Sequence, residues 1–71
     1  MRYVIVIEKG AISFGAYVPD LPGCVVAAET REVAVRSIRE SIEVHLEEMR
    51  EEGIAVPEPA SSAEYFEVSM A

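Results

Sequence analysis

The segment from Tyr17 to Val25 contains the proline-rich turn that most constrains the fold of this chain. It reads Tyr-Val-Pro-Asp-Leu-Pro-Gly-Cys-Val and lies between two apolar runs. Each proline fixes φ at about −65° and has no amide hydrogen for a sheet, whereas Gly23 can adopt the positive φ of a Pro-Gly turn. One strand must therefore end before Pro19, and another must begin after Gly23. The loop is either a structural corner or a preformed contact surface.

The length of 71 residues predicts one domain over residues 1–71, with no separate DNA-binding domain. A domain of this size buries only about 60% of the surface that its unfolded chain exposes. Cys24 is the only cysteine and His45 the only histidine, so one chain has neither an internal disulfide nor a Cys/His zinc site. Self-association is the remaining source of stability, and a hydrophobic content of 51% favours it. We expect a homo-oligomer, either a dimer or a tetramer.

The distribution of charge and apolar residues narrows the range of partners. No apolar run approaches the roughly 18 residues of a membrane span, and residues 1–8 are too short for a signal peptide. We therefore expect a cytoplasmic protein that does not bind membranes. The net charge of −7, from 13 acidic and 6 basic residues, argues against direct nucleic-acid binding, which requires Lys and Arg at the phosphates. The acidic surface either attracts a basic protein partner or only maintains solubility.

Hydrophobic periodicity predicts four strands and one long helix. The strands cover residues 2–8, 12–18, 24–28 and 65–70. The helix begins after an N-cap at Thr30 and ends with Gly53 as a left-handed C′ residue. The third strand runs parallel to the first, so a right-handed crossover places the fourth strand beside the first. The predicted fold is α+β, with the order β-β-β-α-β, a mixed four-stranded sheet of order 3-2-1-4 and one helix on one face. This arrangement is a partial ribonuclease-H-like sheet.

The first strand has apolar residues on both of its faces. Tyr3, Ile5 and Ile7 point to one side, and Val4 and Val6 point to the other. A single helix covers only one face of a sheet, and large exposed apolar patches are unusual on monomers. We therefore expect the homo-oligomer to form through the uncovered face or through an edge strand.

No group of residues predicts a catalytic, cofactor-binding or metal-binding site. Cys24 and His45 could come level on the third strand and the helix, but no acid is placed to orient the histidine and no oxyanion loop is present. The alternative is that Cys24 is a small buried apolar residue and His45 is a helix residue at the edge of the core. A two-metal nuclease needs three or four converging acids, whereas the strands offer only Glu8 and Glu67. We predict that the protein is not an enzyme.

Several motifs between residue 3 and about residue 59 point to one family. They are Phe14-Gly15-Ala16-Tyr17-Val18-Pro19-Asp20-Leu21-Pro22-Gly23-Cys24-Val25, Thr30-x-Glu32-x-Ala34, Ile38-x-Glu40-x-Ile42, Glu52-Gly53 and Val56-Pro57-x-Pro59. In their order and spacing the chain resembles the HicB-like antitoxin family, as a stand-alone N-terminal-type domain. The resemblance implies a ribonuclease-H-like fold without nuclease residues. It also implies a toxin–antitoxin role, in which the protein binds and occludes a small basic mRNA-cleaving toxin of the HicA type.

The resemblance leaves two hypotheses for the function. In the first, the protein is an antitoxin, and the loop residues Asp20, Leu21, Pro22 and Gly23 contribute contacts to the toxin; the alternative for this loop is a corner that only reverses the chain. In the second, the protein is an orphan structural or scaffolding oligomer without a toxin partner. Many family members continue into a DNA-binding domain, which we do not expect here.

Overall fold

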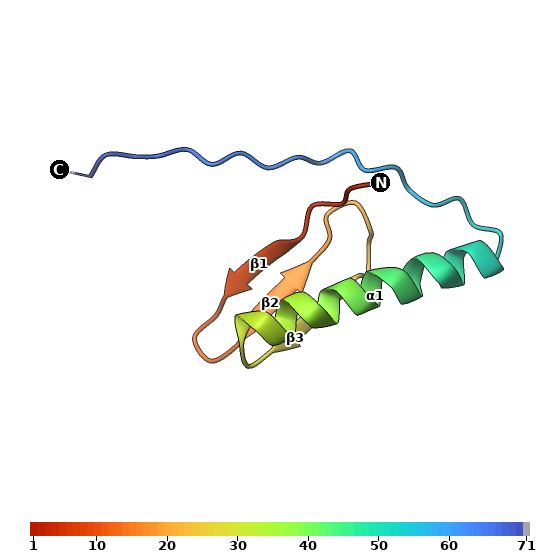
Figure 1. Cartoon of the computed structure of the whole chain (residues 1–71), viewed down its shortest axis with the longest axis horizontal. Helices are drawn as coiled ribbons and strands as arrows, with labels where there is room; N and C mark the ends of the chain where they lie inside the picture. Colours follow the sequence, from red (N-terminus) through yellow and green to blue (C-terminus); the bar gives the residue numbers. More distant parts are fainter. Residues whose placement is uncertain (71) are drawn as a thin grey trace.

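The computed structural model describes residues 1–70 and places one long helix across a small antiparallel sheet (Figure 1). Within this range the strands are β1 (Val6–Lys9), β2 (Phe14–Tyr17) and β3 (Val25–Ala28), and the helix is α1 (Arg31–Glu51). The predicted α+β class is confirmed. No helix in the described range combines the length and the apolar composition that crossing a membrane would require.

The three strands pair in the order β1-β2-β3, and both pairs are antiparallel. The amide of Gly10 donates to the carbonyl of Ser13 at 2.7 Å, which closes the hairpin between β1 and β2. The amide of Val18 donates to the carbonyl of Cys24 at 3.2 Å, which closes the second connection. The strands overlap the first three predicted ranges but are shorter, because regular pairing ends where these turns begin.

The proline-rich segment forms a corner with its own internal hydrogen bonds. The amide of Leu21 donates to the carbonyl of Val18, and the amide of Cys24 donates to the carbonyl of Leu21, both at 3.1 Å. Gly23 has φ +85°, so the predicted left-handed conformation is confirmed. The side chain of Leu21 is fully buried, and the corner therefore supplies part of the core.

Both ends of α1 follow the local chemistry of the sequence. The side chain of Thr30, in extended backbone, accepts a hydrogen bond from the amide of Val33 at 3.2 Å. At the other end Gly53 has φ +71°, and the amide of Ile54 donates to the carbonyl of Met49 at 2.8 Å. The N-cap and the left-handed C′ glycine were both predicted, and both are confirmed.

The core lies between α1 and one face of the sheet. Its buried residues are Ala16, Val18, Leu21, Cys24, Ala34 and Ile38. Ala34 and Ile38 are one helical turn apart and completely inaccessible, so they form the centre of the stripe that docks on the strands. Ile42 and Leu46 continue this stripe with partial burial.

The opposite face of the sheet has no such cover. Val6 pairs with Tyr17, and Tyr17 pairs with Val25, which gives one apolar row across all three strands. Their sequence neighbours Ile7, Ala16 and Val26 pack into the core, so this row points away from α1. Val25 is 64% exposed and Tyr17 is 38% exposed. We call Val6, Tyr17 and Val25 the far-face row.

The prediction of a fourth strand over residues 65–70, in sheet order 3-2-1-4, is wrong for the described chain. After α1, residues 54–70 form an extended tail without helix or strand, which runs past the N-terminus and away from the sheet (Figure 1). The sheet is consequently antiparallel and three-stranded rather than mixed. Hydrogen bonds described below hold Pro57 at Tyr3 and residues 60–61 at Asp20, and the tail leaves the sheet beyond them. The ribonuclease-H-like fold stays a prediction.

Replacing Ile38 by alanine should lower the free energy of unfolding by about 2–5 kcal/mol, since it leaves a cavity in a fully buried position. Urea unfolding followed by helical circular dichroism measures this change. The same substitution at Ile12, which is 91% exposed, is the matched control and should change stability by less than about 0.5 kcal/mol. Equal effects at the two positions would contradict the assignment of the core.

Candidate partner-binding surfaces

The carboxylate of Asp20 binds the tail of its own chain. Oδ2 accepts hydrogen bonds from the amides of Ala60 at 3.0 Å and Ser61 at 2.9 Å, and Oδ1 accepts one from the hydroxyl of Ser61 at 2.9 Å. Both carboxylate oxygens are therefore engaged by residues that lie about forty positions away in the sequence. We call Asp20 and its two partners the tail anchor.

A second contact holds the same part of the tail. The hydroxyl of Tyr3 donates a hydrogen bond to the carbonyl oxygen of Pro57. Residues 2–4 and residues 59–63 line a common cleft, so the start of the tail lies beside the N-terminal segment. The sequence analysis missed both contacts. Their only signal is the placement of prolines at 57 and 59, which keeps this stretch extended but does not say where it binds.

The other residues of the predicted contact loop differ in accessibility. The side chain of Leu21 is buried in the core, whereas Pro22 and Gly23 are exposed at the tip of the corner. The corner is thus a structural element that also presents two exposed residues. Contact between this loop and a partner stays a prediction.

Cys24 and His45 do not form a hydrogen bond with each other in the described range. The thiol of Cys24 is buried, and its polar neighbour is the hydroxyl of Ser41, at 3.6 Å. Ser41 lies one helical turn before His45 and was missed by the sequence analysis, because a serine on a helix gives no distinctive pattern. A hydroxyl does not activate a thiol for nucleophilic attack. No group of three or more potential metal ligands occurs among residues 1–70.

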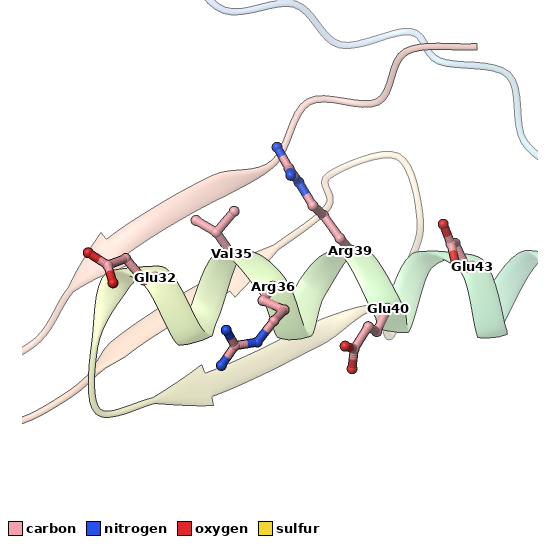
Figure 2. Close-up of a pocket in the computed structure, with 6 residues that line it drawn as sticks. All are labelled: Glu32, Val35, Arg36, Arg39, Glu40 and Glu43. Atoms are coloured by element: carbon pink, nitrogen blue, oxygen red, sulfur yellow. The ribbon is translucent and has the colours of Figure 1, made fainter.

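The outward side of α1 carries an open groove. It is lined by Glu32, Val35, Arg36, Arg39, Glu40 and Glu43. Figure 2 shows Arg36 and Glu40 projecting to one side of the helix, and Val35, Arg39 and Glu43 to the other. The groove therefore offers one apolar side chain between charged groups of both signs.

Charge is unevenly distributed along α1. From residue 31 to 39 the helix has three arginines and one glutamate, whereas residues 40–51 include Glu40, Glu43, Glu47, Glu48 and Glu51. Arg50 forms an exposed ion pair with Glu47 at 3.3 Å, a contact worth little by itself. Val44 is 57% exposed within this acidic half. We call residues 43–51 the acidic end of α1.

Hydrogen bonds from the backbone amide of Ser61, the amide of Ala60 and the hydroxyl of Ser61 hold the pKa of Asp20 below its usual value of 3.8. Because the pKa of Asp20 is lower in the folded state than in the unfolded state, the charged carboxylate stabilises the folded, anchored chain at pH values above the unfolded-state pKa. This contribution should be lost as the pH falls through the lower, folded-state pKa. An NMR titration of the Asp20 carboxyl group should give a midpoint below 3.8, and a midpoint above it would contradict the anchor.

Replacing Asp20 by asparagine should release the tail while leaving the sheet and α1 intact. Asparagine has the same shape but only one acceptor oxygen and no charge, so the amides of Ala60 and Ser61 should exchange with solvent faster. Amide hydrogen exchange measured by NMR would detect this difference. Glu58→Gln, a charge-neutralising change at an exposed neighbour, is the control and should leave both exchange rates unchanged.

Comparisons with known proteins agree with this architecture. The chain matches the model of a family described as the HicB-like antitoxin of bacterial toxin–antitoxin systems over residues 3–69. It is 35% identical over 66 residues to an uncharacterized 14.9 kDa protein from the rep-hol intergenic region of Haemophilus phage HP1, covering 93% of this chain and 50% of that protein. The chain thus spans about half the length of this phage relative.

Two further relatives are similar over comparable regions. A UPF0150 protein of Helicobacter pylori is 40% identical over 50 residues, which cover 70% of this chain and 69% of that protein. A solved structure described as the HicA3 and HicB3 toxin–antitoxin complex contains a chain with a TM-score of 0.70 and 33% identity. The match covers 84% of this chain and 70% of that one. The family match over residues 3–69 shows that this chain belongs to the HicB-like antitoxins of bacterial toxin–antitoxin systems.

Proposed function

We propose that this protein neutralises a small, basic, HicA-type toxin that cleaves mRNA, by binding over its active site. The observation that carries the proposal is the match of 84% of the chain to a chain of the HicA3 and HicB3 complex, together with the family match. In this proposal the protein acts by occlusion and performs no chemistry of its own. The geometry around Cys24 supports this view, since its polar neighbour is a serine hydroxyl.

We place the toxin on the acidic end of α1. A basic partner is attracted to a surface of opposite charge, and the net charge of −7 provides a long-range field of the right sign. The acidic end adds a short-range feature, because Val44 is exposed among four glutamates. An apolar contact surrounded by charges resembles the centre and rim of a protein interface.

The antitoxin would work as a homo-oligomer, either a dimer or a tetramer. The far-face row of Val6, Tyr17 and Val25 supports this part of the proposal, because two of its side chains are substantially exposed. Burial of such a row between copies would remove apolar surface from water. The far-face row lies on the strands and the acidic end lies on α1, so the two proposed contacts use different elements.

The proposed neutralisation can be tested with a small basic protein of the HicA type, expressed as the toxin. Co-expression of the antitoxin should restore the growth of cells that produce the toxin, and the two proteins should co-purify. Failure of both rescue and co-purification would contradict the antitoxin function. It would favour the orphan oligomer instead.

Neutralising three glutamates of the acidic end, in E43Q/E47Q/E51Q, should weaken toxin binding about tenfold or more and reduce its salt dependence, because rim charges act mainly on the association rate. Surface plasmon resonance at several salt concentrations measures both quantities. The control, E8Q/E29Q/E58Q, removes the same charge from exposed positions elsewhere and should have a smaller effect. Equal effects would mean that net charge, and not this surface, determines binding.

A further inference from the structure

The last part of the tail has the character of a strand without a partner. Tyr65 and Phe66 are almost completely exposed, and Met70 is 88% exposed. In extended backbone the side chains alternate, so Phe66, Val68 and Met70 share one side, whereas Tyr65, Glu67 and Ser69 share the other. This period-two pattern, apolar on one side and largely polar on the other, is typical of a half-buried strand.

The sheet has an open edge that could accept such a strand. β1 pairs only with β2, so the backbone groups on its other side have no strand partner within the described range. Arg2 lies before β1 and Lys9 lies at its end. Residues 64–70 of the tail carry Glu64 and Glu67. Because β1 also carries Glu8 beside Lys9, the complementarity between the edge and the tail segment lies in their backbone hydrogen-bonding groups.

The segment does not pair with β1 of its own chain. The tail anchor and the bond between Tyr3 and Pro57 fix the start of the tail beside residues 2–4. Beyond this point the tail diverges from β1 (Figure 1). A tethered strand meets its own edge at a high effective concentration, so pairing within the chain would form first if the geometry allowed it. The structure shows no such pairing, which leaves a second copy as the source of the partner strand.

We propose that residues 65–70 of one copy add as a fourth strand to the open edge of β1 in a second copy, and that the exchange is reciprocal. A reciprocal exchange closes under two-fold symmetry and gives a dimer with two added strands. The apolar side of each added strand then lies next to the partly buried Ile5 and Ile7 of the other copy. The exchange forms through the edge of β1 and leaves the far-face row uncovered, so it is a contact distinct from the one proposed above, and it is independent of toxin binding.

The full-length protein should have the mass of a dimer in light scattering at micromolar concentration. Val68→Lys places a charge on the apolar side of both exchanged strands and should weaken the dimer about a hundredfold, since burying a valine contributes roughly tenfold per strand. Ser69→Lys introduces the same charge on the opposite side of the segment and should leave the dimer intact. Val68 lies outside the core, so the circular dichroism of α1 reports that both variants fold.

Isotope-filtered NMR on a mixture of differently labelled copies identifies which strands pair. Contacts between residues 65–70 of one label and β1 of the other would support the exchange. Contacts only within one label, a monomeric wild-type mass, or equal dissociation of the two lysine variants would each overturn it. These measurements use the protein without toxin. The monomeric variant can then be tested for toxin binding, which separates a failure of the exchange from a failure of the antitoxin function.

Discussion

The burial of Leu21 in the core connects the local chemistry of the proline corner with the rest of the structure. Leu21 and Ile38 are the largest fully buried side chains, and they join the corner and α1 in one apolar cluster. Because Leu21 points inward, its neighbour Asp20 is held at the periphery with its carboxylate towards the tail. The three hydrogen bonds of the tail anchor follow from this placement. The path of residues 57–61 is thus determined by the packing of a corner that precedes them by about forty residues.

The parts of the fold that sequence reasoning predicted are those whose causes are local. Thr30 and Gly53 delimit the helix through bonds to residues within a few positions, and Gly23 adopts a turn that its neighbours require. The fourth strand failed because its prediction rested on apolar alternation and a topological rule. Neither the alternation nor the rule could take into account that Asp20 would accept hydrogen bonds from Ser61. A carboxylate that binds main-chain amides forty residues away leaves no periodic signal in the sequence.

The two candidate surfaces also differ in how far the sequence alone could predict them. The loop of Asp20, Leu21, Pro22 and Gly23 was identified from its composition, yet the side chains of Asp20 and Leu21 serve the protein's own structure. The acidic end of α1 was visible only as a general excess of glutamate. The structure adds that the glutamates of this end are exposed, with Arg50 as the one arginine among them. Composition therefore left open whether the acidic residues attract a basic partner or only maintain solubility, and the structure adds which of them are exposed on α1.

The tail anchor also limits how this region can vary between related proteins. Two of its three hydrogen bonds come from the backbone amides of Ala60 and Ser61, which every residue except proline provides. Substitutions at position 60 should consequently be tolerated over a wide range of size and polarity. Proline alone would remove a donor there, while the aspartate that receives the bonds has no equivalent substitute of the same length and charge. Homologues can thus vary at position 60, which donates through its backbone amide, while the aspartate at position 20 remains fixed.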